Sequence, residues 1–339
     1  MDKNYAKSLE KQGYRVVGNH SAVKICNWTR NALNGKGSCY KCKFYGIRSH
    51  RCIQMTTSMS CANRCIICWR GDKAPVSKKW KGKIDNPKNI LTDSIKAQIN
   101  LLQGFKGNKN INKNLLIEME NPKHAALSLI GEPITYPKIN ELVNLMHKKR
   151  ISTFVVTNAQ FPKAIKKLKS ATQLYVSVDA PNKVLLKKID KPLFPDFWQR
   201  LNKSLNELSK KKFRTCIRLT IVKGINDVDL KGYSNLIRKG NPDFIEAKAF
   251  MRLGPSRKLF VWDNMPNHEY VKNFAKRLNK YLPKYEFAAE HKPSSVVLLM
   301  KKSLKKKRFI DFEKFFEIAN KNKIPETKRY SALKMAKVP

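Results

Sequence analysis

Short apolar runs alternate with helix-like segments along most of this chain, and this alternation limits the possible folds more than any other feature. A β-prone run covers residues 51–57, and further apolar runs follow at residues 125–130, 152–157, 173–178, 215–222, 245–250 and 296–300. Helix-like segments lie among them, at residues 92–105, 138–149, 162–169, 196–211, 229–239 and 268–281. Repeated strand–helix units build a parallel sheet with right-handed crossovers. The sequence therefore predicts an α/β protein.

Residue types at two of the helix starts fit this prediction. Thr92 and Asp93 are N-cap residue types, and Pro162 suits the first turn of a helix. Ligands of such folds bind at the carboxyl ends of the strands. The residues that follow each apolar run are therefore the first candidates for a functional site.

Three closely spaced cysteines, Cys61, Cys65 and Cys68, follow the first β-prone run. Thiolates hold iron–sulfur clusters, and a cubane usually takes four of them. Three thiolates on one loop leave one iron open for a ligand, as a catalytic zinc ion keeps one position open. The alternatives are three cysteines that only pack, or a zinc site with a distant fourth ligand. We call these three residues the triad.

Four more cysteines precede the triad, namely Cys26, Cys39, Cys42 and Cys52. Cys39 and Cys42 have the Cys-x-x-Cys spacing of zinc and iron–sulfur sites, so a structural zinc site of four cysteines is a real alternative here. Eight cysteines without an apolar leader segment indicate metal binding or catalysis in a reducing compartment. No run approaches the roughly 18 apolar residues of a membrane span. We expect a soluble, cytoplasmic protein that does not bind membranes.

The charge of the chain is strongly unbalanced. Seventy Lys and Arg residues stand against 25 Asp and Glu residues, which gives a formal net charge of +45. A general surface preference for lysine is usually balanced by glutamate, so it does not account for this excess. A field of this sign attracts polyanions and binds phosphates. Nucleic acid is therefore the expected partner.

The triad, with apolar Ile67 before Cys68, resembles the signature of the radical S-adenosylmethionine (radical SAM) superfamily. In that superfamily the open iron binds the amino and carboxylate groups of the methionine part of SAM. The resemblance implies a 4Fe–4S cluster at Cys61, Cys65 and Cys68, with SAM as the second cofactor.

A second run makes the resemblance closer. Residues 39–52 read Cys-Tyr-Lys-x-Lys-Phe-Tyr-Gly-Ile-x-Ser-His-Arg-Cys, which is similar to the hallmark of the 4-demethylwyosine synthase family. Cys26 and the Trp-Arg-Gly-Asp run at residues 69–72 fit the same family, and the similarity extends over about residues 15 to 300. It implies a partial (β/α)6 TIM-like radical SAM barrel. We expect an N-terminal cluster-binding extension at residues 1–51, the barrel at residues 52–300, and a basic C-terminal extension at residues 301–339.

The same resemblance implies a second 4Fe–4S cluster, with one open iron, at Cys26, Cys39 and Cys52. Cys42 lies at a position expected to vary, so it is either a bystander or a fourth ligand. All three ligands lie before the first barrel strand or at its start. We expect them to fold over the mouth of the barrel and face the triad.

Two lysines in this run are candidates for a covalent adduct with a substrate. The family uses pyruvate as a carbon donor, and a lysine amine condenses with a ketone once burial or nearby cations lower its pKa. Lys41 is the first candidate for this adduct and Lys43 the second. Either lysine could instead contact phosphate or solvent, and the pyruvate could instead bind the second cluster.

Polar residues at four later strand ends are candidate contacts for SAM or substrate. Gly131 and Glu132 follow the second strand and are similar to the superfamily's Gly-Gly-Glu site for the methionine amine, with Ile130 in place of the first glycine. The other candidates at strand ends are Asn158, Ser177, Asp179 and Arg218. For each of these, a purely structural role is the alternative.

The C-terminal segment is basic and then aromatic. Residues 301–308 are mostly lysine and could contact phosphate or form a solvated strip. Phe309, Phe312, Phe315 and Phe316 have the spacing of one helix face, which we expect to dock on the barrel.

The family's activity joins N1-methylguanosine, next to the anticodon of tRNA-Phe, to two carbons of pyruvate and forms the tricyclic 4-demethylwyosine. We expect a monomer that receives electrons from a separate flavodoxin or ferredoxin. One alternative is another two-cluster radical SAM enzyme of RNA modification, similar to a methylthiotransferase. The other is a zinc-stabilised RNA-binding protein without catalysis.

Overall fold

A ten-stranded sheet organises the computed structural model, which describes residues 3–70 and 74–335. Six strands lie side by side in sequence order, and each is parallel to the next. These six are β3 (Cys52–Thr56), β4 (His124–Leu127), β5 (Ser152–Thr157), β6 (Gln173–Ser177), β7 (Thr215–Ile221) and β8 (Phe244–Ala249). The α/β prediction is confirmed, and each predicted run from 125–130 to 245–250 overlaps one of these strands.

Antiparallel strands extend the sheet at both edges. On one side, β2 (Ser21–Lys24) pairs with β3 and with β1 (Tyr14–Val17). On the other side, β10 (Val296–Lys301) lies between β8 and β9 (Tyr285–His291). The apolar run at residues 296–300 is thus a strand, as predicted, but it runs against β8.

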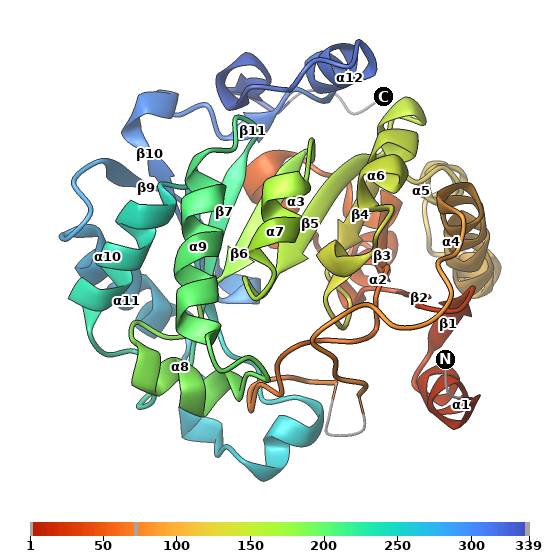
Figure 1. The fold of residues 1–339 in the computed structure, drawn as a ribbon. Coiled ribbons are helices and arrows are strands. Elements are labelled where there is room, and N and C mark those ends of the chain that lie inside the picture. The colour runs from red at the N-terminus through yellow and green to blue at the C-terminus, as the bar shows by residue number, and fades with distance from the viewer. Residues whose placement is uncertain (1–2, 71–73, 336–339) are drawn as a thin grey trace.

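Helices that follow β3 in the chain pack along one face of the sheet (Figure 1). They are α4 (Pro87–Leu102), α6 (Ile139–Lys148), α7 (Pro162–Lys167), α9 (Phe197–Ser209), α10 (Leu230–Gly240) and α11 (His268–Asn279). Pro162 is the first residue of its helix, as predicted. Thr92 and Asp93 are not N-caps, because α4 begins earlier. Asn86 caps it by accepting a hydrogen bond from the Lys88 amide at 2.8 Å, and Pro87 follows.

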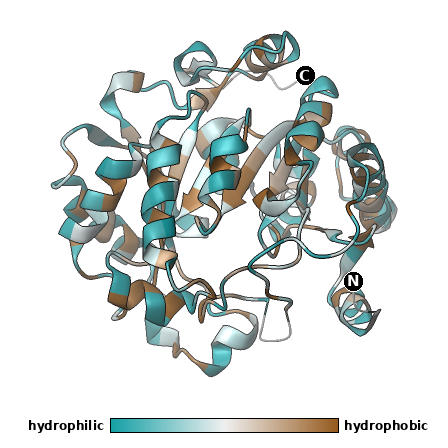
Figure 2. Ribbon diagram, viewed as in Figure 1, coloured by the Kyte–Doolittle hydropathy of each residue, from teal (hydrophilic) through white to brown (hydrophobic). Residues whose placement is uncertain are grey.

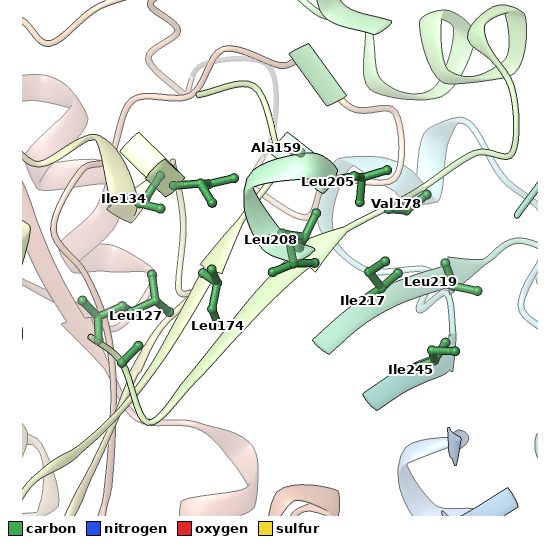
Figure 3. Packing of buried hydrophobic residues seen from close by; sticks show 14 of the residues in the cluster. Leu127, Ile134, Ala159, Leu174, Val178, Leu205, Leu208, Ile217, Leu219 and Ile245 are labelled. Carbon is green, nitrogen blue, oxygen red and sulfur yellow. The ribbon is translucent and has the colours of Figure 1, made fainter. Parts of the chain in front are cut away.

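The two faces of the sheet differ in what they contact, because successive side chains on a strand point to opposite faces. The outer face is apolar and fully buried against the helices. Figure 3 shows Leu174, Ile217, Leu219 and Ile245 packed close to Leu205 and Leu208 of α9. Brown, hydrophobic residues gather on the strands in Figure 2, and the outward turns of the helices are teal.

The opposite face, which we call the inner face, carries the alternate residues of β3 to β8. Several of these side chains are only half-buried, although they lie in the middle of the sheet: Gln54, Val156, Ser177, Arg218, Thr220 and Lys248. Solvent therefore reaches the inner face between its two ends. The carboxyl end of the strands, from which the triad loop leaves, is called the mouth below.

The amino end of the strands is closed by segments from both chain termini. α3 (Tyr40–Tyr45) lies against β9 and β11 (Phe309–Ile310), and α12 (Phe312–Asn320) packs beside α6. Phe312, Phe315 and Phe316 are buried there, which confirms the predicted docking for these three residues, whereas Phe309 lies in the strand β11 and not on the helix. The basic run begins at this end too, because Met300 pairs with Phe244, the first residue of β8.

Several short elements were not predicted. The helices among them are α1 (Lys3–Lys11), α2 (Asn27–Leu33), α3, α5 (Lys113–Met119) and α8 (Lys183–Asp190), and the last short strand is β12 (Ser331–Ala332), which pairs with β11. Turns of 3₁₀ helix occur at Ser49–Arg51, Gln103–Gly107, Pro133–Thr135, Gly254–Lys258, Trp262–Asn264, Lys292–Ser294, Lys302–Leu304 and Thr327–Arg329. Among the described residues, no helix has both the length and the apolar character to cross a membrane.

Candidate active site

The triad loop is held at the mouth by hydrogen bonds from its own backbone to α8. The amides of Arg64 and Ile66 donate to the carbonyls of Asp190 and Ile189 at 3.0 and 2.8 Å. The Asn63 side-chain amide donates to the Asp190 carboxylate at 3.1 Å. These contacts fix the loop without using a cysteine, so the three thiols are free to serve as ligands.

The three thiols lie close enough to influence one another. Burial raises the pKa of Cys61 to about 11, and the nearby Arg70 guanidinium opposes this shift. The pKa of Cys65 is raised well above its usual value by burial, and the charges of Asp190 and Cys61 add to the effect. Such thiols release their protons when a metal binds, because the thiolate is the ligand. Gly71 and Asp72 of the same run lie outside the described residues.

Arg70 supplies a cation beside the triad. Its guanidinium donates to the Asn63 carbonyl at 2.7 Å, and its Nη1 atom is buried without a hydrogen-bond partner among the described residues. Burial works to lower the pKa of Arg70, but the negative charges of Cys61 and Cys68 outweigh it and the net shift is upward. An anionic cluster at these thiols would be balanced by this cation.

Glu132 is buried at the mouth with one carboxylate oxygen unpaired. Its Oε2 accepts a hydrogen bond from the Asn158 amide at 2.9 Å, whereas Oε1 has no partner among the described residues. Burial raises the pKa of Glu132 to about 7, against the hydrogen bonds from Thr157 and Asn158. A buried oxygen without a donor fits a ligand that brings an ammonium group, as SAM does.

Gly131 is required by the triad loop, whereas the sequence suggested that it makes room for a ligand. Its φ is +67°, and a Cβ atom there would lie 1.9 Å from the Ser58 carbonyl oxygen. The next amide, that of Glu132, donates to the Ser58 and Ser60 carbonyls at 3.1 and 2.9 Å. Gly131 therefore lets β4 end against the chain that leads to the triad.

Asn158 links these two groups directly. Its side-chain amide donates to the Cys61 sulfur at 3.2 Å, and its backbone amide binds Glu132. The carboxylate site and the triad thus meet at one residue from β5. Their shared position at the mouth fits a SAM molecule that contacts both.

Ser177, Asp179 and Arg218 lie on the inner face, below the mouth. Burial raises the pKa of Asp179 to about 6, and one of its carboxylate oxygens is unpaired among the described residues. Arg218 is already engaged, because its Nε donates to Glu246 at 3.2 Å and its Nη2 donates to the Tyr40 hydroxyl at 2.8 Å. Its guanidinium therefore lies deeper than a contact to SAM at the mouth requires.

The second group of cysteines lies at the closed amino end. Cys52 is the first residue of β3, and Cys39 caps the start of α3. Burial raises the pKa of Cys52 to about 12, and the charges of Cys39 and Cys26 add to that shift, so the three thiols are neighbours. The expectation that they fold over the mouth is wrong. They approach the inner face from the opposite end, because α3 fills the amino end.

The turn of α3 places Lys41 and Lys43 in different environments. Lys41 is buried, with its ammonium 4.9 Å from the Phe154 ring centre and 5.1 Å from that of Tyr175. Burial lowers the pKa of Lys41, and Arg218 lowers it further, although Cys52 opposes both. Lys43 is exposed. Only Lys41 reaches the inner face.

Cys42 lies at the same amino end as the other cysteines of its group. Its side chain packs, half-buried, against the aromatic cluster at the amino end. Its backbone amide donates to the Cys39 carbonyl at 3.0 Å. The fold thus brings Cys26, Cys39 and Cys52 together with Lys41, and uses Cys42 for packing.

The described residues contain no set of three His, Cys, Asp or Glu side chains arranged around one point as for a single metal ion. A cubane spreads its ligands over separate irons, so its thiolates stand further apart than the ligands of one ion. Two features of the donor sets fit such clusters: each has three neighbouring thiols, and each has a buried cation beside it, Arg70 or Lys41.

A pocket of about 520 Å³ opens beside the triad loop. Its wall includes Ser58 and Ser60 of the loop and the aromatic rings of Trp80 and Phe161, and its rim carries the exposed residues Lys79, Lys81 and Lys83. Aromatic rings and lysines in one pocket are typical of sites for unpaired nucleotides.

Sequence reasoning missed Glu246 and Lys248 on β8. Both point to the inner face, where Glu246 is fully buried and receives hydrogen bonds from Arg218 and the Tyr45 hydroxyl. The signal was present, since these two charged residues alternate with apolar residues within a strand. Asp190 was missed because α8 was not predicted.

Comparison with sequence families gives two matches. A model of the radical SAM superfamily matches residues 55–237, which is more than half of the 339 residues. A model described as wyosine base formation matches residues 239–301. The first covers the triad and strands β4 to β7, and the second covers β8 to β10.

Curated relatives share close to half of their matched residues with this chain. A tRNA 4-demethylwyosine synthase that depends on S-adenosyl-L-methionine, from Oryza sativa subsp. japonica, is 47% identical over 96% of this chain and 51% of its own length. The TYW1 enzyme of that name from Homo sapiens is 46% identical over 92% of this chain and 43% of its own length. The chain thus spans about half the length of the curated relatives it matches.

Two solved structures align with nearly the whole chain. One is a structure of TYW1 with a lysine-pyruvate adduct bound, which has a TM-score of 0.81 and 33% identity over 92% of this chain and 99% of that chain. The other is archaeal TYW1, with a TM-score of 0.73 and 30% identity over 89% of this chain and 97% of that chain. This chain therefore belongs to the radical SAM superfamily and, within it, to the TYW1 family.

Proposed function

We propose that this protein is a 4-demethylwyosine synthase, which joins N1-methylguanosine, next to the anticodon of tRNA-Phe, to two carbons of pyruvate. One observation carries the proposal: the buried amine of Lys41 lies on the inner face beside the thiols of Cys39 and Cys52. The names of the relatives support it, and they do not favour a methylthiotransferase or a zinc-stabilised binding protein.

The fold proposed for this activity is a partial (β/α)6 barrel, in which β3 to β8 surround the inner face. The N-terminal extension at residues 1–51, the barrel at residues 52–300 and the C-terminal extension at residues 301–339 are proposed as its parts. The order of the six parallel strands supports this reading. The strands β1 and β2 of the extension continue the same sheet.

Two 4Fe–4S clusters and SAM are the proposed cofactors, with Cys61, Cys65 and Cys68 holding one cluster and Cys26, Cys39 and Cys52 the other. Bound at the triad, the cluster and SAM supply a 5′-deoxyadenosyl radical that removes hydrogen from the N-methyl group of the substrate. Glu132 and Asn158 bind the methionine part of SAM at the mouth. Ser177 and Asp179 contact SAM or the substrate nucleoside further in.

Lys41 holds pyruvate as an imine. Its neutral amine adds to the keto carbon, a proton moves from nitrogen to oxygen, and water leaves as the carbon–nitrogen double bond forms. Burial and the nearby Arg218 favour the neutral amine, because both lower the pKa of Lys41. The lysine-pyruvate adduct named for the related TYW1 structure supports this role over cluster-bound pyruvate. Lys43 is exposed and is assigned no part in it.

The tRNA approaches from the mouth. Lys79, Lys81 and Lys83 surround a pocket next to Ser58 and Ser60, which is where phosphates of an unstacked anticodon loop would lie. The basic run at residues 301–308 begins at the closed end, so the lysines at the mouth are the preferred phosphate contacts.

Electrons reach the triad from a separate flavodoxin or ferredoxin in this proposal. Apolar side chains near the triad, Trp69, Leu259 and Trp262, are 38%, 62% and 67% exposed, as in surfaces that bind protein partners. The protein acts as a monomer. Its location is the cytoplasm, and the eight free cysteines suit a reducing compartment.

The direct test is product formation under anaerobic conditions. Reconstituted enzyme, SAM, a reductant and ¹³C-labelled pyruvate are incubated with tRNA-Phe that carries N1-methylguanosine. Mass spectrometry of the digested RNA should show a tricyclic nucleoside that contains two labelled carbons. The variants Cys61→Ala and Lys41→Arg should form none, since they remove a cluster ligand and the imine-forming amine.

Two outcomes would oppose the proposal. Absence of label in the RNA, while SAM is cleaved, would mean that pyruvate is not the carbon donor. Product formation by Lys41→Arg would mean that pyruvate is held without an imine. Cys216→Ala is the matched control, because Cys216 is a buried cysteine of β7 outside both thiol groups.

A further inference from the structure

Lys248 is a cation on the inner face to which no role has been assigned. It lies on β8 two residues beyond Glu246 toward the mouth, and its Cα partner on β7 is Thr220. Among the described residues no carboxylate lies within ion-pair distance of its ammonium, and no hydrogen bond to this group is present. A half-buried cation without a partner is a candidate site for an anionic ligand.

The carboxylate of Glu246, two residues before Lys248, already accepts hydrogen bonds from other side chains. Glu246 accepts the Tyr45 hydroxyl at 2.8 Å on Oε1 and the Arg218 Nε at 3.2 Å on Oε2. Arg218 and Glu246 therefore form a closed pair, and Lys248 lies beside it as an additional positive charge. Burial lowers the pKa of Lys248 to about 8, with a further lowering by Arg218 that Glu246 opposes.

Lys41 and Lys248 lie around the same arginine. The ammonium of Lys41 and the guanidinium of Arg218 both lie over the Tyr175 ring, 5.1 and 4.7 Å from its centre, and Lys248 is on the strand paired with that of Arg218. Lys41 comes from α3 at the amino end, and Lys248 lies two residues nearer the mouth than Glu246. Lys248 and Ser177 are both half-buried, so solvent reaches this part of the inner face.

We propose that Lys248 binds the carboxylate of the 2-oxo acid whose keto carbon is held by Lys41. In a 2-oxo acid the carboxylate is bonded directly to the keto carbon, so an imine at Lys41 keeps the carboxylate within a short distance. The Nε and Nη2 atoms of Arg218 are used by Glu246 and Tyr40, and the freely rotating ammonium of Lys248 is available. This inference rests on the proposed function.

The experiment traps the imine with borohydride in the anaerobically reconstituted enzyme without RNA. The trapped fraction, measured by protein mass spectrometry, is followed against the concentration of pyruvate. Lys248→Met should raise the half-saturating concentration roughly 10- to 100-fold, because a charge-assisted contact is lost. Lys248→Arg should recover most of the affinity, and Lys276→Met, which changes an exposed lysine on α11, should leave it unaltered.

Methyl pyruvate provides a second arm, since it has the same keto carbon but no charge. The wild-type enzyme should trap pyruvate at a lower concentration than methyl pyruvate, and Lys248→Met should lose this preference. If Lys248→Met does not fold, Lys248→Gln carries the same test. An unchanged preference in the folded variant would overturn the inference.

Two results separate the inference from the function on which it rests. If the wild-type enzyme traps no pyruvate at all, the imine at Lys41 is wrong. If trapping is normal in Lys248→Met but the affinity for SAM falls, Lys248 binds the carboxylate of SAM, and the present assignment is wrong.

Discussion

Individual side chains at the mouth determine whether SAM can bind, and Glu132 is the clearest case. Glu132→Gln removes the charge but keeps the shape, so we expect the dissociation constant for SAM to rise roughly tenfold or more. The iron content should stay the same, because Glu132 is not a thiolate ligand. Anaerobic equilibrium dialysis measures both. Glu141→Gln, an exposed change on α6, is the control, and an unaltered SAM affinity in Glu132→Gln would remove this residue from the cofactor site.

The cysteines at the amino end provide a matched set of variants. Cys26→Ala, Cys39→Ala and Cys52→Ala should each lose about half of the bound iron, since each cubane needs its own thiolates. SAM binding and cleavage at the triad should continue, but the modified nucleoside should not form. Cys42→Ala should resemble the wild-type enzyme, because Cys42 packs against the aromatic cluster. Equal iron loss in Cys42→Ala would give the second cluster four protein ligands.

For individual residues, the sequence indicated which side chains are candidates for the site, but it did not indicate which of them are buried. The triad spacing and the 39–52 run indicated candidate ligand cysteines and made Lys41 the first candidate lysine. The sequence alone could not show which of Lys41 and Lys43 is buried, because this depends on the turn of α3. Lys248 was missed because a charged residue within an apolar strand gains meaning only when the inner face is known to be reached by solvent.

Among the elements, the closure of the amino end depends on one buried arginine. Arg214 is fully buried and donates hydrogen bonds to Gln173, to Ser331 at 2.6 Å and to the Arg308 carbonyl at 2.6 Å. It also lies over the Phe244 ring, 4.4 Å from its centre. This side chain joins β6 and β7 to the C-terminal segment.

Arg214→Ala should therefore lower the free energy of unfolding by about 3 kcal/mol or more, because it leaves several buried polar groups unpaired. Urea unfolding followed by circular dichroism measures the loss. Arg150→Ala, which breaks the exposed ion pair with Glu313, should lower the same free energy by less than about 1 kcal/mol. Similar losses in the two variants would show that Arg214 does not anchor the segment.

At the scale of elements, the long repeating units were predictable and the short ones were not. β5 matches its predicted run at both ends, since β-branched and aromatic residues fill it and Asn158 follows. α2, α3 and α8 have six to eight residues each, which is too short for a clear apolar period. Cys26 and Cys39 directly precede α2 and α3, and α8 anchors the triad loop, so the sequence did not reveal these supports of the candidate site.

For the whole molecule, the excess of positive charge makes a prediction about RNA. With 70 basic and 25 acidic residues, contacts to phosphates should dominate the affinity for tRNA. If the anticodon arm makes about six or more such contacts, the affinity should fall roughly a thousandfold between about 50 and 200 mM salt. Filter binding over a salt series measures the slope. SAM cleavage without RNA is the control, and a flat binding curve would oppose a phosphate-driven interaction.

Among the described residues, α3 and the C-terminal segment cover the amino end of the sheet, and the inner face opens toward the mouth. In the described part of the chain, α3 packs with buried aromatic residues that include Phe44 and Tyr175, so we expect the reactants to enter from the mouth. In the proposed function, the 2-oxo acid binds deepest, at Lys41, and the tRNA covers the mouth. If the proposed function is correct, we expect an ordered reaction in which the 2-oxo acid binds first, SAM binds second and the tRNA binds last.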